Sequence, residues 1–156
     1  MRIAVIGRTE ILYEMVLLLE SEGHEISCII TSREAPEYER TASDYAILSD
    51  RLNVPFGNGS RIVEVSELIK ESKSDIAVSF NYTGIIPQEI IDLFPLGILN
   101  AHGGDLPRYR GNACQAWAIL NGEDRIGICI HKMIGGELDS GGIITRDYMP
   151  IDLGTK

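Results

Sequence analysis

An amide and an imidazole stand two positions apart at the end of a short apolar run, where they could act on one substrate. They are Asn100 and His102. If the run is a β-strand, both side chains point to the same face, because strand side chains alternate with period two. An amide N–H can stabilise an oxyanion, and an imidazole, with a pKa of about 6.5, can exchange protons near neutral pH. The alternative is that the pair only makes hydrogen bonds within a loop.

A carboxylate in a glycine-rich segment is the distant candidate partner of this pair. Asp139 follows Asn100 by 39 residues, and glycines occupy positions 135, 136, 141 and 142 around it. Such a segment is either a plain turn stabilised by the aspartate or a loop whose backbone lies close to a ligand. The residue types alone leave both interpretations open.

The elements that must position these residues alternate along the chain. β-Branched runs typical of buried strands occupy 2–7, 25–31, 75–80, 97–101, 126–133 and 142–149, with a brief extended piece at 54–56. Helical spacing or capping signals mark 10–22, 43–52, 66–72, 87–94 and 114–121. This order predicts an α/β fold, a Rossmann-like three-layer open sheet that is mostly parallel, with antiparallel strands at the C-terminal side.

Three local features complete the expected fold. Ser43 and Ser66 are the expected N-caps of two helices. The Gly-Asn-Gly sequence at 57–59 is an expected turn. The last five residues, 152–156, read as the start of a further element, so we expect the sequence to be a fragment.

Composition narrows the class of partner and the compartment. The 156 residues carry a formal net charge of −9, whereas nucleic-acid binders usually carry a basic excess, so a nucleic-acid partner is not expected. No apolar run approaches the roughly 20 residues that cross a bilayer, and the first ten residues are too quickly polar for a signal peptide. We therefore expect no membrane association and a cytoplasmic protein.

Cofactor motifs are missing from the sequence. Cys28, Cys114 and Cys129 have no metal-site spacing, so we expect no metal. Cys28 and Cys129 lie in apolar, strand-like runs, and we expect them to be buried, reduced thiols. Residues 6–10, after the first strand, hold one glycine where a dinucleotide loop needs three, and Glu10 would repel a pyrophosphate. The sequence predicts no NAD.

Together these segments resemble the folate-dependent formyltransferases, a family that includes the methionyl-tRNA, glycinamide ribonucleotide and amino-sugar enzymes. The resemblance rests on Asn100 and His102, on DLPRYRG at 105–111 and on LDSG at 138–141, and it covers nearly the whole chain. It implies that residues 1–156 are a formyltransferase catalytic core lacking the family's C-terminal helix and any C-terminal domain. The stretch QAWAILNGE at 115–123 looks most like the amino-sugar branch.

The resemblance also implies a formyl donor and a role for each catalytic residue. The donor would be 10-formyltetrahydrofolate. Asn100 would donate a hydrogen bond to the oxyanion of the tetrahedral intermediate, and His102 would stabilise it as imidazolium or protonate the leaving folate nitrogen. Asp139 would favour the charged imidazole and position a water or accept the amine proton. A turn-stabilising role is the alternative for Asp139.

Two segments would hold the flat folate pterin, whose edge backbone groups can read. They are Gly84, Ile85, Ile86, Ile134, Gly135, Gly136, Glu137 and Leu138. For the two isoleucines at 85 and 86, the alternative is ordinary packing at a helix start. The acceptor would be a primary amine, most simply on a nucleotide-linked amino sugar, and the residues expected to read it are Arg110, Asn112, Gln115 and Trp117. Core packing is the alternative for Trp117.

Other functions stay open on the sequence alone. A methionyl-tRNA formyltransferase would need a basic RNA-binding extension. A folate- or nucleotide-binding module without catalysis, and a hydrolase that releases formate from the same donor, could use the same core. A homodimer is also open. His24 and His131 are expected to be structural.

Overall fold

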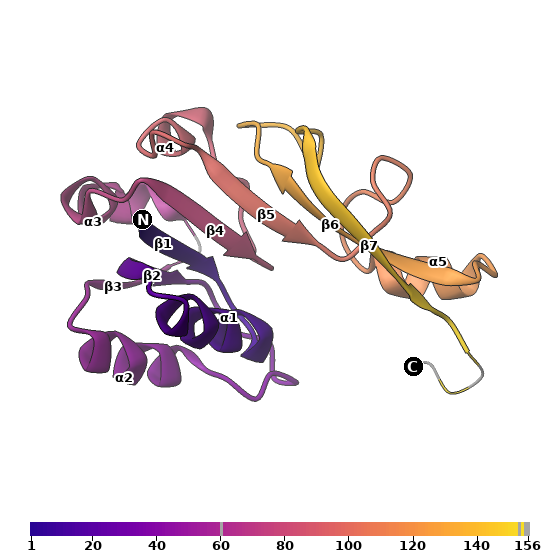
Figure 1. Cartoon of the computed structure of the whole chain (residues 1–156), viewed down its shortest axis with the longest axis horizontal. Helices are drawn as coiled ribbons and strands as arrows, with labels where there is room; N and C mark the ends of the chain where they lie inside the picture. Colours follow the sequence, from indigo (N-terminus) through magenta and orange to yellow (C-terminus); the bar gives the residue numbers. More distant parts are fainter. Residues whose placement is uncertain (60, 153, 155–156) are drawn as a thin grey trace.

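The computed structural model describes residues 1–59, 61–152 and 154, and it shows one mixed sheet between layers of helices (Figure 1). The strands are β1 (Arg2–Gly7), β2 (Glu25–Thr31), β3 (Phe56–Asn58), β4 (Ile76–Phe80), β5 (Ile98–His102), β6 (Arg125–Lys132) and β7 (Ile143–Pro150). The helices are α1 (Glu10–Ser21), α2 (Ala42–Leu52), the 3-10 helix η1 (Ile62–Val65), α3 (Ser66–Ser72), α4 (Gln88–Ile91) and α5 (Cys114–Leu120).

The strand order, β3-β2-β1-β4-β5-β6-β7, creates the crevice in which a ligand would bind. The chain builds outward from β1 to β2 and β3, then crosses to place β4 on the other side of β1. Neighbours from β3 to β5 are parallel, whereas β6 pairs antiparallel with both β5 and β7. In such sheets the ligand site lies beyond the carboxyl ends of the strands, where the order reverses. The predicted fold class is confirmed.

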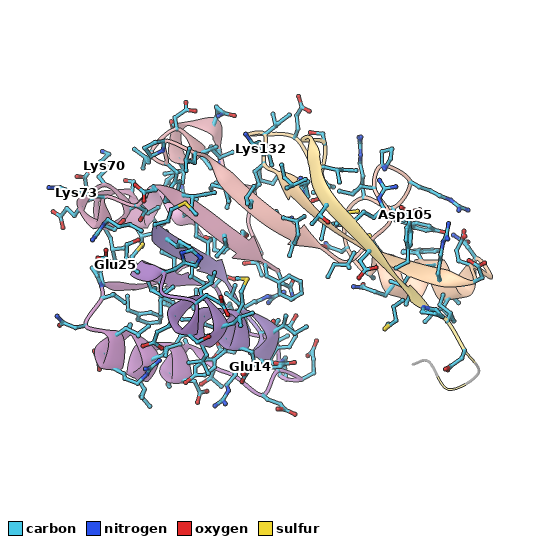
Figure 2. All side chains as sticks on the ribbon, in the orientation of Figure 1. Glu14, Glu25, Lys70, Lys73, Asp105 and Lys132 are labelled. Carbon is cyan, nitrogen blue, oxygen red and sulfur yellow. The ribbon has the colours of Figure 1, made fainter. Side chains whose placement is uncertain are left out.

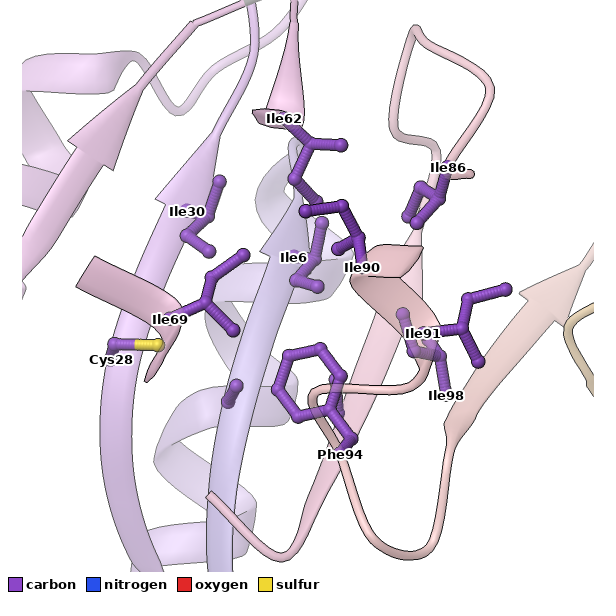
Figure 3. Close-up of a cluster of buried hydrophobic side chains, with 12 residues drawn as sticks. Ile6, Cys28, Ile30, Ile62, Ile69, Ile86, Ile90, Ile91, Phe94 and Ile98 are labelled. Atoms are coloured by element: carbon purple, nitrogen blue, oxygen red, sulfur yellow. The ribbon is translucent and has the colours of Figure 1, made fainter. Parts of the chain in front are cut away.

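Two apolar clusters fix the sheet between its helices. On one face, α1 and α2 cover residues such as Val5 and Ile29. On the other face, η1, α3 and α4 cover an isoleucine-rich cluster, where Ile6 of β1 packs with Ile69 and Phe94 (Figure 3). Each fully buried side chain of this kind contributes about 1.5–3 kcal/mol of transfer free energy, which makes the strand ends a rigid platform.

Two local predictions are wrong at the residues that begin α2 and form β3. The N-cap of α2 is Thr41 rather than Ser43, and the Asp44 carboxylate accepts hydrogen bonds from the Thr41 backbone N–H (2.8 Å) and hydroxyl (2.9 Å). Gly57 and Asn58 are not a turn but part of β3, paired in parallel with β2. A non-local ladder has overridden the local turn signal.

Two more boundaries differ from expectation. Ser66 is the first residue of α3 and not its N-cap, because η1 precedes it directly. The helix expected over 87–94 is shorter, and α4 ends at Ile91. The further element expected after residue 152 falls largely on Leu153, Thr155 and Lys156, which lie outside the described residues.

The structure also bears on the cysteines and on possible membrane-spanning helices. Cys28 and Cys129 are buried free thiols, as predicted, and Cys114 is buried and free as well. In the part of the chain that the structure describes, every helix is too short or too polar to cross a membrane.

Candidate active site

A cavity of about 420 Å³ opens at the carboxyl ends of β1, β4 and β5. Its walls are formed by residues 8, 38, 79–82, 84–86, 100–103, 111–115, 131, 133, 134 and 137–139. The cavity therefore gathers the Asn-x-His strand, the segment after β4, the start of α5 and the glycine-rich loop, which are far apart in the sequence.

Asn100 faces a histidine across the sheet. Asn100 and His131 are direct partners in the antiparallel β5–β6 ladder, and Asn100 Nδ2 lies 3.2 Å from His131 Nε2. His131 Nδ1 lies 2.9 Å from the Lys132 carbonyl oxygen, which can only accept, so Nδ1 carries a proton. In neutral His131, Nε2 then accepts one N–H of the Asn100 amide. The other N–H of that amide stays free to donate to a ligand.

His102 is held by hydrogen-bond acceptors at both ring nitrogens. Nε2 lies 2.8 Å from the Tyr109 carbonyl oxygen, and Nδ1 lies 3.4 Å from Asp139 Oδ2. Since a carbonyl can only accept, Nε2 carries a proton, and the ring can donate from both nitrogens only as imidazolium. The geometry therefore holds the imidazole in the cavity wall between the Tyr109 carbonyl oxygen and the Asp139 carboxylate.

Asp139 lies between the two histidines and remains a carboxylate well into the acid range. Burial alone raises the pKa of this carboxyl, but the contact with His131 (Nε2 to Oδ1, 3.5 Å), the hydrogen bond from the Gly111 N–H (2.9 Å) and the electrostatic effect of nearby His102 outweigh it. The net result is a lowered pKa. Its φ of 47° lies in the left-handed region, which aspartate tolerates better than most residues.

His131 is the member of this group that sequence reasoning missed, since the sequence indicates only a structural role. The structure buries its side chain at 2% exposure within reach of both Asn100 and Asp139. Strand alternation puts His131 on the same face as Cys129, but only the pairing register shows that this face meets Asn100.

Cys114 adds a thiol beside the imidazole. Its Sγ lies 3.5 Å from His102 Nε2, and its S–H donates to the Gly111 carbonyl oxygen at 3.3 Å. Burial, and then the negative charge of Asp139, raise the pKa of this thiol. The thiol is therefore neutral at physiological pH and a poor nucleophile there.

We expect Cys114 to react slowly with iodoacetamide near pH 7 and faster as pH rises, because only the thiolate reacts. Asp139→Asn should speed this alkylation, because it removes a charge that raises the pKa of the thiol. Mass spectrometry of the modified peptide at several pH values measures the rate. Cys28 is buried in the hydrophobic core, so its alkylation rate in Asp139→Asn shows whether the substitution loosens the whole structure. A rate at Cys114 that does not rise in Asp139→Asn contradicts the assignment.

The segments expected to hold a pterin form one wall of the cavity. Gly84, Ile85, Ile86, Ile134, Glu137 and Leu138 line it. Three of the apolar side chains are exposed to solvent, by 73% for Ile85, 43% for Ile134 and 60% for Leu138. An exposed apolar cluster in a cavity wall is typical of a surface that a bound ligand covers. Ile86 is instead 4% exposed and belongs to the core cluster, which is the packing alternative.

The two glycines expected in that wall lie outside it, and Gly135 has a packing role instead. Gly135 and Gly136 do not line the cavity. The Gly135 N–H donates to Gln88 Oε1 at 2.9 Å, and a Cβ at position 135 would lie 2.2 Å from the Gln88 backbone nitrogen. The absence of a side chain at 135 lets the glycine-rich loop lie against α4.

The residues expected to read the acceptor separate into two groups. Asn112 and Gln115 line the cavity, whereas Arg110 and Trp117 do not. Trp117 is 56% exposed on α5, so the core-packing alternative does not describe it either.

Two other side chains, not anticipated from the sequence, form the cavity end near β1. Arg8 donates to the carbonyl oxygens of Arg33 (2.7 Å) and Asn81 (3.0 Å), and its guanidinium lies 5.0 Å from the centre of the Tyr38 ring. This end of the cavity is therefore positive and aromatic, which suits an anionic group on a planar molecule.

No metal centre is formed by the described residues. Among them, no three His, Cys, Asp or Glu side chains are grouped so that they could hold a metal ion. The chemistry available to the site is that of an amide donor, two imidazoles and a carboxylate. Such a set can stabilise an oxyanion and move protons, which are the requirements of acyl transfer.

The fold and the sequence together define the class of protein to which this chain belongs. The chain belongs to the formyl transferase family, which matches residues 1–156.

Individual relatives agree on the family. The chain is 32% identical over 157 residues to the methionyl-tRNA formyltransferase of Acetivibrio thermocellus, a match that covers 97% of this chain and 50% of that protein. The chain thus spans about half the length of this curated relative.

Solved structures share the fold at lower identity. Phosphoribosylglycinamide formyltransferase from Bacillus halodurans superposes with a TM-score of 0.81 at 20% identity, over 100% of this chain and 83% of that one. WlaRD, a sugar 3N-formyl transferase solved with dTDP and 5-N-formyl-THF, superposes with a TM-score of 0.68 at 19% identity, over 97% of this chain and 53% of that one.

Proposed function

We propose that the protein transfers a formyl group from 10-formyltetrahydrofolate to a primary amine. The observation that carries the proposal is the convergence of Asn100, His102 and Asp139 on one cavity. One wall of that cavity carries the exposed apolar side chains of Ile85, Ile134 and Leu138, which a flat pterin ring could cover. Nothing in the proposed chemistry requires a metal or NAD.

In the proposed reaction, the acceptor amine attacks the formyl carbon, and the carbonyl electrons move onto oxygen. The free N–H of Asn100 and the positive charge of His102 stabilise that oxyanion, which exists only near the transition state. When the intermediate collapses, the carbon–nitrogen bond to the folate breaks and that nitrogen takes up a proton. The amine releases a proton to water or to Asp139.

The contacts of His102 favour its electrostatic role over direct proton donation. Its Nε2 proton is directed at the Tyr109 carbonyl oxygen, 2.8 Å away, rather than into the open cavity. Stabilising an oxyanion by charge needs no change in that contact. Protonating the leaving nitrogen would require the contact to open first.

For the acceptor, we propose an amino sugar carried on a nucleotide. Arg8 and Tyr38 at one end of the cavity are suited to an anionic, planar group. The sugar formyltransferase WlaRD, with dTDP in its structure, offers a precedent for such an acceptor in this fold.

A second candidate acceptor is methionyl-tRNA, favoured by the 32% identity to a methionyl-tRNA formyltransferase. The formal net charge of −9 on the chain disfavours RNA binding by these residues themselves. Under this alternative, RNA contacts would come from residues outside the present sequence.

We expect 5-formyltetrahydrofolate, a non-transferring analogue of the donor, to bind with a Kd in the range of about 1–100 μM. Isothermal titration calorimetry measures this affinity, and NADH, which should not bind, is the control. With 10-formyltetrahydrofolate and a panel of nucleotide-linked amino sugars, mass spectrometry should detect a formylated sugar. Formate as the sole product would indicate a hydrolase, and binding of NADH but not folate would overturn the proposal.

A further inference from the structure

The loop 103–111 contacts both His102 and Asp139 through its backbone. Its Tyr109 carbonyl oxygen accepts from His102 Nε2 at 2.8 Å. Two residues later, its Gly111 N–H donates to Asp139 Oδ2 at 2.9 Å. A shift of this loop would therefore move the imidazole and the carboxylate together.

On its outer side, the same loop is fastened to the turn that follows α5. The Tyr109 hydroxyl donates to Glu123 Oε1 at 2.8 Å, and Arg108 Nη1 donates to Glu123 Oε2 at 3.0 Å. Asn121 Nδ2 donates to the same Tyr109 hydroxyl at 3.1 Å. Glu123 is only 19% exposed, so its hydrogen bonds are shielded from water more than those of a surface pair.

The other end of the loop is fastened to β7. Asp105 Oδ1 accepts from the Tyr148 hydroxyl at 3.1 Å and pairs with Arg146 Nη1 at 3.3 Å. Figure 2 shows Asp105 beside the α5 end of the β6–β7 pair, with Lys132 at the opposite end. With Asp105 held there, the Glu123 contacts decide where the second half of the loop lies.

The Tyr109 side chain also has space into which it could move. A separate cavity of about 80 Å³ lies against Tyr109, Glu123 and Gly127, behind the active-site cavity. Glu123 does not line the active-site cavity, so it cannot touch a substrate there. Whatever it contributes to turnover must pass through its contacts with Tyr109 and Arg108 of the loop.

We propose that Glu123 is a positioning residue for formyl transfer. By fixing the Tyr109 hydroxyl outside the loop, it holds the Tyr109 carbonyl against His102 and the Gly111 N–H against Asp139. This inference rests on the proposed function for its kinetic consequence, but its structural consequence exists in the free protein.

The test uses three variants of the same link. Glu123→Ala removes the acceptor, and Tyr109→Phe removes only the donor hydroxyl while keeping the carbonyl. Glu123→Gln keeps an oxygen that can accept from Tyr109 and is the conservative rescue. Glu67→Ala, which breaks the exposed Glu67–Lys70 ion pair on α3, is the matched control for losing a paired carboxylate.

In the ligand-free protein, hydrogen exchange at the Gly111 amide should accelerate at least about 10-fold in Glu123→Ala and Tyr109→Phe. Exchange should stay near the wild-type rate in Glu123→Gln and Glu67→Ala. In turnover assays, kcat should fall by about 10- to 100-fold in the first two variants, because small misplacements of catalytic groups are costly. The Kd for 5-formyltetrahydrofolate should change little, since Glu123 lies outside the pterin wall.

The outcomes separate the two proposals. Unchanged Gly111 exchange in Glu123→Ala and Tyr109→Phe overturns the positioning role whether or not the protein forms formylated product. Faster exchange with unchanged kcat also overturns it. If the wild-type protein forms no product but Gly111 exchange is still faster in the two variants, the positioning of the loop by Glu123 stands. Only the formyl-transfer proposal is then refuted. If Glu123→Ala fails to fold, Tyr109→Phe, which changes one oxygen atom, decides the matter.

Discussion

Replacing Asn100 with alanine is expected to lower kcat by about 100- to 1,000-fold, the usual cost of losing one oxyanion donor. His131 takes one N–H of the Asn100 amide, so the other is the donor available to the oxyanion. Because the oxyanion is absent from the bound donor, the Kd for 5-formyltetrahydrofolate should change by no more than about 3-fold. Single-turnover kinetics and calorimetric titration measure the two quantities.

Asn112→Ala is the matched amide control for this experiment. Asn112 lines the same cavity but is not a member of the histidine–carboxylate group, so its loss should raise KM for the acceptor and spare kcat. A kcat of Asn100→Ala within about 5-fold of the wild type would remove Asn100 from the proposed chemistry.

Gly104→Ala is expected to disable the site by steric means. A Cβ at position 104 would lie 2.7 Å from His102 Nε2, 2.7 Å from the Tyr109 carbonyl oxygen and 2.8 Å from Cys114 Cβ. The His102 ring, the Tyr109 carbonyl and the Cys114 Cβ cannot all shift to make room for this Cβ. The hydrogen bond between His102 and Tyr109 should therefore break. We expect kcat to fall by about 100-fold and stability by about 1–3 kcal/mol, the usual cost of overpacking.

Urea unfolding and steady-state kinetics check both parts of this prediction. Gly142→Ala is the control, because a Cβ there would meet no atom within 4 Å. Turnover of Gly104→Ala near the wild-type rate would show that the His102 ring can shift without loss, and the Tyr109 carbonyl contact would then be dispensable for catalysis.

The sequence was sufficient to place Asn100 and His102 in one site because strand alternation is a local property. His131 could not be found in this way, since its role depends on the β5–β6 register, which pairs residues 31 positions apart. The contribution of Tyr109 was equally hidden. Its contact with His102 is made by a backbone carbonyl, which any residue could supply.

The wrong predictions have a related physical cause. Gly57 and Asn58 carry a strong turn signal, but pairing with β2 recruits them into an edge strand. The core-packing alternative for Trp117 also fails, because helix α5 presents this side chain to solvent. In both cases the neighbouring element, and not the local residue types, determined the outcome.

The location of Asn100 and His131 opposite each other in the β5–β6 ladder has a consequence for how this protein could change. Paired central strands open only in rare, near-global unfolding, so the reacting groups are the least plastic part of the cavity. The surfaces around Arg8 and Asn112, which are proposed to contact the acceptor, lie on loops, and loops accept sequence changes far more readily. Substrate preference can therefore drift over generations while the reacting groups stay fixed. A directed-evolution library confined to these loops should yield variants with altered acceptors and an unaltered chemical step.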